Sequence, residues 1–159
     1  MRDVIGSLWG ILIGVLLLGA VITVGYKALQ NNKASNAISG ISQLTAGVES
    51  LYNGQGTYAS LTNTVALNAG LVPQDMNVGG VIQDPWAGAV TLAPDATPSM
   101  FDITLASVPA AACASMATTV KGVAVTLPTG GKQNMPVDAG TAATDCAAGG
   151  SVTFVFGQE

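Results

Sequence analysis

The sequence predicts an α+β fold in which one long N-terminal helix lies across one antiparallel sheet. Three observations lead to this fold class. The first 52 residues contain no proline and carry apolar residues at helical spacing. The residues after Gly56 form short β-branched stretches separated by glycine and proline. Long helices do not alternate with these stretches, so the strands are expected to pair antiparallel.

The first half of the predicted helix is apolar on every side. Val4–Tyr26 has no charged residue, and its 23 residues are enough to cross a bilayer core of about 30 Å. This run is too long for the apolar part of a cleaved secretory signal. Gly6, Gly10 and Gly14 recur at every fourth position, which allows close approach of a neighbouring helix. We therefore expect residues 1–27 to insert in a membrane and to pack against copies of themselves. A lone membrane anchor is the alternative.

The second half of the helix is amphipathic. Apolar residues recur at spacings of three and four on a helix otherwise rich in asparagine, serine and glutamine. These apolar positions are Ile38, Ile41, Leu44, Val48 and Leu51. The glycines of Asn53-Gly54-Gln55-Gly56 end the helix, which gives a length of roughly 75–80 Å. The apolar stripe requires a folded partner, and we expect residues 28–159 to form one globular head.

Four stretches of the head have strand character. They are Ala89–Leu92, Phe101–Leu105, Gly122–Leu127 and Ser151–Phe156. Their alternation predicts a solvated sheet face formed by Thr91, Asp102, Thr104, Thr126 and Thr153. The alanine-rich stretch Pro109–Thr119 predicts a short helix. Polar exposed loops are expected at Asn63–Asn68, Asp95–Ser99 and Thr129–Thr144, and Trp86 is expected to pack in the core.

Composition excludes most catalytic and nucleic-acid functions. Charged residues are 9% of the chain, against roughly 25% in typical soluble domains. The absence of histidine removes the usual general base and the commonest metal ligand. Five basic residues and a net charge of −4 are too little for a surface that neutralises phosphates, so we expect no nucleic-acid partner. The carboxylates stand singly along the sequence, and no EF-hand spacing occurs. We expect a structural protein without catalytic residues, cofactor or metal.

Cys113 and Cys146 are the only two cysteines of the chain. In an oxidising compartment they are expected to form a disulfide, which would close a loop of 34 residues counting both cysteines. The chain-entropy model assigns about 3–4 kcal/mol to such a loop. Two buried free thiols are the alternative.

The order of several short motifs resembles that of type IV pilins. The apolar and amphipathic half-helices are followed by Tyr52–Tyr58 (YNGQGTY), by Asp84–Gly88 (DPWAG) and by the C-terminal cysteine pair. The stretches Ser35–Gln55 and Leu67–Asn68 are most similar to class b, near the bundle-forming and conjugative thin-pilus pilins. The resemblance covers essentially the whole chain and implies the pilin fold, with a disulfide-closed C-terminal region.

The resemblance implies the major subunit of a type IVb pilus, an extracellular homopolymer that serves adhesion, aggregation or conjugative mating contact. In this family, residues 1–27 would hold the unassembled subunit in the inner membrane, with the head in the periplasm, until the pilus assembly machinery builds a helical filament. A minor pilin, a type II secretion pseudopilin and a membrane-anchored binding domain that does not polymerise are the alternatives.

The family also implies N-terminal processing. A prepilin peptidase removes a leader and methylates the new N-terminal amine, and Met1 is acceptable as the first mature residue of class b. Type IV pilins usually have a glutamate at the fifth position, where this chain has Ile5. Asp3 is the nearby carboxylate, and we expect it to pair with Arg2 or with the Met1 amine of the same or a neighbouring chain. Placement of Arg2 and Asp3 in the lipid headgroup layer is the alternative.

Overall fold

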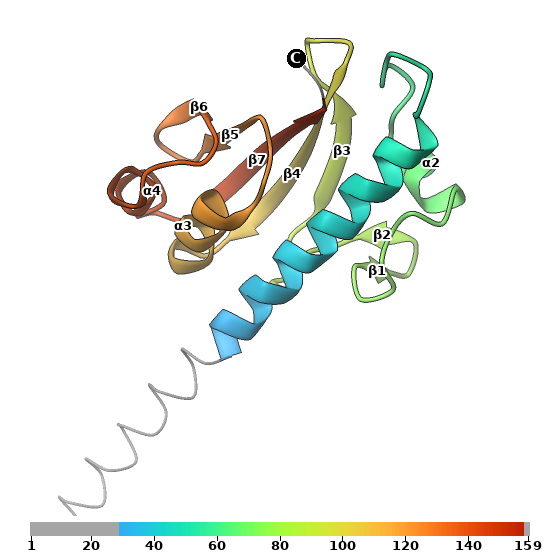
Figure 1. Cartoon of the computed structure of the whole chain (residues 1–159). Coiled ribbons are helices and arrows are strands. Elements are labelled where there is room, and N and C mark those ends of the chain that lie inside the picture. The colour runs from blue at the N-terminus through green and yellow to red at the C-terminus, as the bar shows by residue number, and fades with distance from the viewer. Residues whose placement is uncertain (1–28, 158–159) are drawn as a thin grey trace, which may run out of the picture. The chain divides into compact units, whose positions relative to one another are not determined.

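The head, residues 33–157, is built from a five-stranded antiparallel sheet and a long helix that lies across one face of it (Figure 1). The strand order is β3-β4-β7-β5-β6. The strands are β3 (Val90–Pro94), β4 (Met100–Val108), β5 (Ala124–Leu127), β6 (Gly131–Asn134) and β7 (Gly150–Gly157). All four neighbouring pairs are antiparallel, as the sequence predicts.

The computed structural model describes residues 29–157, of which 29–51 are helical and are called the long helix below. The apolar run Val4–Tyr26 lies outside the described residues. Among the residues that the structure describes, no helix combines the length and the hydropathy that a membrane span requires.

The apolar stripe of the long helix is buried against the sheet. Ile41, Leu44 and Val48 have no solvent-exposed surface and belong to the main core, as predicted. Each contributes about 1.5–3 kcal/mol through burial. Leu51 does not follow the prediction, since it is 39% exposed. Tyr52 takes its place, because the position four residues after Val48 continues the buried stripe.

A chain of aromatic rings joins the end of the long helix to the sheet. The ring of Tyr58 lies 5.2 Å from that of Tyr52 and 4.7 Å from that of Phe101, measured between centroids. Phe101 on β4 lies 5.7 Å from Phe156 on β7. The Tyr58 N–H also donates to the Pro98 carbonyl in the turn between β3 and β4. These contacts fix the direction in which the chain leaves the helix.

The solvated sheet face is a row of threonines in register. Thr91, Thr104, Thr153 and Thr126 stand side by side across β3, β4, β7 and β5. The hydroxyls of Thr104 and Thr153 are 2.8 Å apart, a hydrogen bond between cross-strand neighbours. The predicted alternation is confirmed for the threonines. The same face also carries a small buried cluster of Met100, Ala124 and Val155, beside which Asp102 is half-buried, so this face is only partly solvated.

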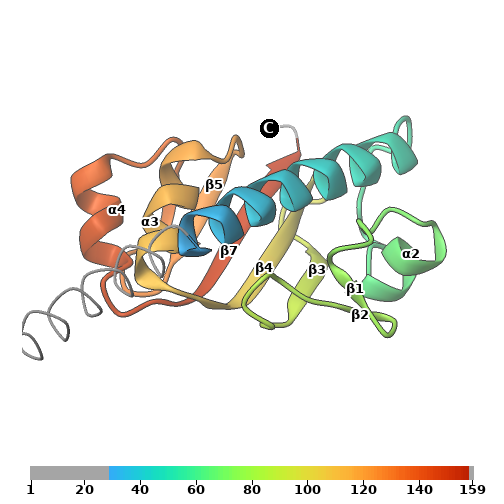
Figure 2. The same cartoon turned by 90° about the horizontal axis from the view of Figure 1, so that it is seen from below.

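The segment between the long helix and the sheet folds on one side of the helix (Figures 1 and 2). It contains α2 (Asn63–Asn68) and a hairpin of β1 (Asn77–Val78) and β2 (Val81–Ile82). Two glycines of the helix receive its side chains, because a β-carbon at Gly40 would lie 2.5 Å from Met76 Sδ and one at Gly47 would lie 3.4 Å from Leu71. Gly40 and Gly47 therefore form a notch in the helix surface, and Met76 and Leu71 of the segment pack into this notch.

Asn63 on α2 covers the outer edge of the sheet. Its side chain donates to the Val90 carbonyl at 2.8 Å and accepts from the Leu92 N–H at 2.6 Å. These are groups of the edge strand β3, which would otherwise be open to pairing with another strand. Pro94 is tolerated at the end of the same strand because an edge strand does not need every N–H.

Asp84 holds the turn that leads into the sheet. Its Oδ1 accepts the N–H groups of Trp86 and Gly88 at 2.9 and 2.8 Å. The turn places Ala87 at a φ of 64°, in the left-handed region that a side chain disfavours. Trp86 is half-buried and packs against the main core, which confirms its predicted role. Asp84 itself is buried, and its Oδ2 has no partner among the described residues.

A disulfide closes the C-terminal region. It joins Cys113 on α3 (Ala110–Thr119) to Cys146, which directly follows α4 (Ala139–Asp145). Both cysteines are buried in the main core, and the described residues contain no free thiol. The disulfide predicted from the sequence is therefore confirmed, and the alternative of two free thiols is wrong.

Two predicted loops are wrong. Asn63–Asn68 is α2, which begins where the Thr62 hydroxyl accepts the Val65 N–H and which buries Ala66. The stretch Thr129–Thr144 contains β6 and most of α4, where the Asp138 carboxylate accepts the N–H groups of Gly140 and Thr141. Both helices start at an N-cap side chain. They are short, so their hydrophobic periodicity is too weak to be read from the sequence.

The two notch glycines should respond differently to alanine. Replacing a glycine in a helix by alanine gains about 1 kcal/mol of helix propensity. Gly47→Ala should retain this gain, because the new β-carbon makes an ordinary contact with Leu71. Gly40→Ala should lose the gain, because the buried Met76 side chain must move, at a cost of about 1–3 kcal/mol. Urea unfolding of both variants measures the difference, and equal stabilisation at the two positions would contradict the notch.

Asp84 should make the stability of the head fall as the pH rises. Burial raises the pKa of its carboxyl, although hydrogen bonds from Gly88 and Trp86 oppose the shift. The folded state then holds the proton more tightly than the unfolded state. Its stabilising contribution is complete below the ordinary pKa of 3.8 and is lost as the pH rises through the raised pKa.

Asp84→Asn removes this titration and keeps an oxygen that can accept both N–H groups. Its free energy of unfolding, compared with that of the unmodified chain, should improve as the pH rises from about 3 through the raised pKa of Asp84, and should change no further above it. Urea unfolding over this range measures the difference. A difference that does not change with pH would show that Asp84 is not destabilised by burial.

Candidate functional site

The structure places only part of the predicted site. Cys113 and Cys146 are brought together, as described above. Met1, Asp3, Gly6, Gly10 and Gly14 lie outside the described residues. Within residues 29–157 no three His, Cys, Asp or Glu residues gather in a way that could hold a metal ion. The candidate functional site is therefore the surface of the head on both sides of the long helix.

An ion pair crosses the solvated face of the sheet. Lys132 on the edge strand β6 lies 3.2 Å from Asp95, which follows the opposite edge strand β3. The N–H of Thr97, and then Lys132, hold the pKa of Asp95 below its ordinary value. The sequence carries no signal for this pair, since 37 positions separate the residues and no local pattern connects them.

Asp102 on β4 lies near this pair. Burial raises the pKa of its carboxyl, and the negative charge of Asp95 raises it further. One oxygen of Asp102 is buried without a hydrogen-bond partner among the described residues. Lys132 therefore pairs with Asp95 and also lies near the Asp102 carboxylate.

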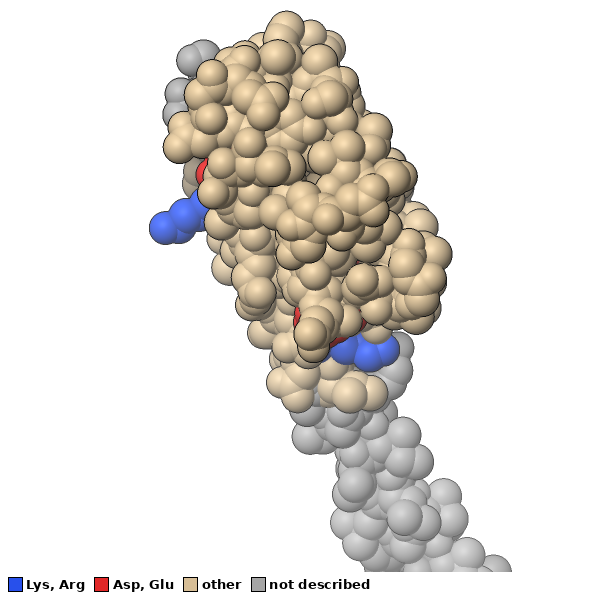
Figure 3. All heavy atoms as spheres, turned by 90° about the vertical axis from the view of Figure 1, so that its right-hand side faces the viewer, with Lys and Arg blue, Asp and Glu red and all other residues tan. Residues whose placement is uncertain are grey.

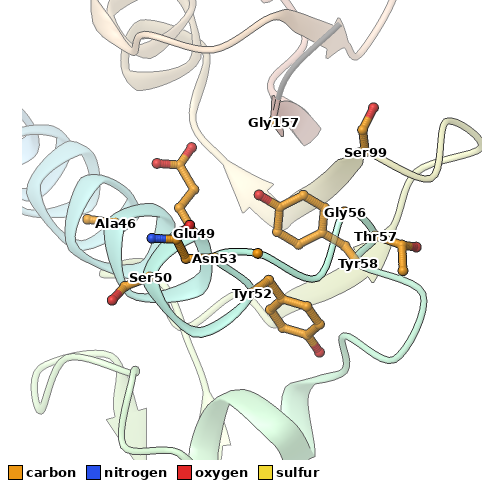
Figure 4. A pocket seen from close by; sticks show the side chains of 11 residues that line it. Ala46, Glu49, Ser50, Tyr52, Asn53, Gly56, Thr57, Tyr58, Ser99 and Gly157 are labelled. Carbon is orange, nitrogen blue, oxygen red and sulfur yellow. The ribbon is translucent and has the colours of Figure 1, made fainter.

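Two grooves lie along one side of the long helix. The larger has a volume of about 740 Å³. It is lined by the end of the helix and by Gly54, Gly56, Thr57, Tyr58, Ser99 and Gly157. Figure 4 shows Glu49 and Tyr58 on opposite sides of it, with the Tyr58 hydroxyl directed toward Glu49. Burial, and then the negative charge of Glu49, raise the pKa of Tyr58. The groove is open, and polar and apolar surface contribute about equally to its lining.

The smaller groove has a volume of about 320 Å³ and separates the long helix from the connection between α3 and β5. It shares Ala46 and Glu49 with the larger groove. Its other lining residues are Ile38, Ser42, Thr45, Thr119, Val120, Lys121 and Phe156. The lining of this groove is therefore more apolar than that of the larger groove. Its two charged lining residues are Glu49 and Lys121.

The opposite side of the long helix has few charges. Figure 3 views the side that carries α2 and the β1–β2 hairpin, and almost all of the described atoms in this view belong to uncharged residues. Two apolar side chains of the hairpin are exposed, Val78 at 54% and Val81 at 51%. The sequence contains a signal for this hairpin, because Gly79-Gly80 between two valines is a two-residue turn pattern.

Comparison with known proteins gives a consistent family. The model of the PilS N terminal family matches residues 30–159. Two curated relatives are the major structural subunits of the bundle-forming pilus from Escherichia coli O127:H6 (strain E2348/69 / EPEC) and from Escherichia coli O111:H-. Each is 33% identical over 113 residues, which are 65% of this chain and 58% of the relative. The chain thus spans less than two thirds of the length of these relatives.

Two solved structures share the fold. The type IV b pilin from Salmonella typhi has a TM-score of 0.60 at 22% identity, covering 79% of this chain and 99% of that one. TcpA, a type IV pilin from Vibrio cholerae El Tor biotype, has a TM-score of 0.58 at 14% identity, covering 78% and 98%. At these identities the likeness establishes the fold. The pilins are structural proteins and not enzymes. The family match and the shared fold, with its C-terminal disulfide, show that the chain belongs to the PilS N terminal family and is a type IVb pilin.

Proposed function

We propose that this chain is the major structural subunit of a type IVb pilus and polymerises through its N-terminal helix. The observation that carries the proposal is its 33% identity to the major structural subunits of the bundle-forming pilus. The head supports the same function, because its grooves are open and its charges are sparse.

The N-terminal residues would form the core of the filament. Val4–Tyr26 is uncharged, so many copies can pack together without burying unpaired charges. Gly6, Gly10 and Gly14 would let neighbouring helices approach closely. Before assembly the same segment would hold the subunit in the inner membrane. Assembly machinery and a prepilin peptidase that methylates Met1 are the partners this route requires.

The filament would serve contact between cells, through adhesion, aggregation or conjugative mating. Filaments that carry little net charge per subunit repel each other weakly and can associate side by side. The net charge of −4 on 159 residues supports such association. The relatives, whose names describe a bundle-forming pilus, point in the same direction.

The glycine positions provide a matched test of the filament core. At about 100° per residue, Gly10 and Gly19 face opposite sides of a helix, roughly 180° apart. Gly10→Leu should abolish filaments, because the larger side chain separates the packed helices, whereas Gly19→Leu should be tolerated. Electron microscopy of sheared surface material measures assembly, and oxidised Cys113–Cys146 in both variants verifies that the head folds. Intact filaments from Gly10→Leu would exclude this packing surface.

Asp3 provides a separate test of subunit docking. A carboxylate in apolar surroundings requires a partner, and the Met1 amine of a neighbouring chain could supply it. Asp3→Ala should therefore reduce the number of pili per cell, while the amount of subunit in the membrane stays unchanged. Quantitative immunoblots of sheared and membrane fractions measure both amounts. A normal number of pili on cells that carry Asp3→Ala would contradict this pairing. It would favour the alternative, in which Arg2 and Asp3 lie in the lipid headgroup layer.

A further inference from the structure

We infer that the exposed valines of the β1–β2 hairpin dock into the smaller groove beside the long helix of a second copy of this chain. This contact rests on the proposed function, because it joins the heads of neighbouring subunits within the filament. It would add a defined head-to-head contact to the packing of the N-terminal helices.

Val78 and Val81 form an apolar knob, called the valine knob below. The two residues are direct partners across the hairpin, and each exposes more than half of its side chain. Gly79 and Gly80 between them have φ values of 61° and 82°, so the turn is tight and the valines are presented at its base. The knob stands on the side of the head where charges are rare (Figure 3). Depletion of charge is characteristic of the centre of protein interfaces.

The smaller groove matches the knob in chemistry. Ile38, Val120 and Phe156 give it apolar contact surface, and its volume of about 320 Å³ suits side chains of modest size. Thr45 also lines the groove, and its buried hydroxyl has no hydrogen-bond partner among the described residues. The lining of the larger groove contains no aliphatic side chain larger than that of Ala46, so it offers two valines a poorer match.

Charge also favours this pairing. The salt bridge Lys132–Asp95 is the only one among residues 29–157, so neither Asp75 nor Lys121 has an ionic partner there. Asp75 is exposed and precedes Val78 by three residues, whereas Lys121 is exposed and lines the smaller groove. Docking of the knob would bring this carboxylate toward this ammonium group. Such a pair fixes the register of an interface more than it adds affinity.

The placement of the two surfaces predicts an open polymer. The hairpin lies on one side of the long helix, and α3 and β5, which border the groove, lie on the other (Figures 1 and 2). A contact between two different surfaces of the same chain is heterologous, and it leaves one knob and one groove free at the ends of every assembly. Repetition of this contact produces a helical filament.

Disulfide trapping tests the contact in assembled filaments. The native cysteines are bonded to each other, so introduced cysteines are the only free thiols within residues 29–157. The variant Val78→Cys with Ser42→Cys places one thiol on the knob and one in the groove, where Ser42 is exposed. Mild oxidation of its filaments should give a ladder of dimers, trimers and higher multimers on non-reducing gels. Each single variant should give no ladder.

The matched control is Val78→Cys with Thr64→Cys, which places both thiols on the same side, because Thr64 is an exposed residue of α2. It should give no ladder. Filaments of the test variant that show no ladder would overturn the contact and leave the pilus function standing. Dimers from Val78→Cys alone would also overturn it, since they report a knob-to-knob contact. Absence of filaments from the unmodified chain would instead overturn the proposed function.

A charge exchange gives a second readout. Asp75→Lys and Lys121→Asp should each cause a loss of sheared filaments, because like charges then meet at the contact. The double variant should restore filaments, since the pair is re-formed with the charges reversed. Losses that persist in the double variant would overturn the pairing of Asp75 with Lys121.

Discussion

Burial of one apolar stripe of the long helix against the sheet is the interaction on which the rest of the head depends. Ile41, Leu44 and Val48 fill the same core as Phe101 and Phe154 from the central strands. The sheet alone would expose this whole apolar face to water, and the helix alone would expose its stripe. Neither element is expected to be stable without the other. The connecting segments, the disulfide and the edge cover by Asn63 add to a core that this contact creates.

The sequence was informative where periodicity is strong, and uninformative where contacts are long-range. The helical stripe, four strands, α3 and the cysteine pair could be predicted, because each has a local pattern or a simple chemical rule. Leu51 shows the limit of a periodic pattern, since Tyr52 is the residue that turns inward. The ion pair of Lys132 with Asp95 had no local signal. It joins a residue of β6 to the residue that follows β3, which are 37 positions apart and belong to strands that do not pair with each other.

The scarcity of charge links the fold to assembly. Charged side chains are costly at the centre of an interface, so a chain that is surrounded by its own copies benefits from having few. Here the charges that remain have defined places. Lys132 and Asp95 neutralise each other on the sheet, Asp84 is used within a turn, and Asp75 and Lys121 stand on opposite sides of the head. The two sides of the long helix thus differ in shape and in charge, which is the condition for a directional polymer.

A helical reconstruction of the filament by electron cryomicroscopy would test this account most directly. We expect a core of closely packed apolar helices from residues 1–27. Heads should surround this core, and in each head the long helix should pack on the sheet of the same chain. Neighbouring heads should meet through the side that carries the β1–β2 hairpin and the side that carries the smaller groove. Filaments whose core lacks these helices, or a chain that is found only as dispersed membrane-anchored monomers, would contradict it.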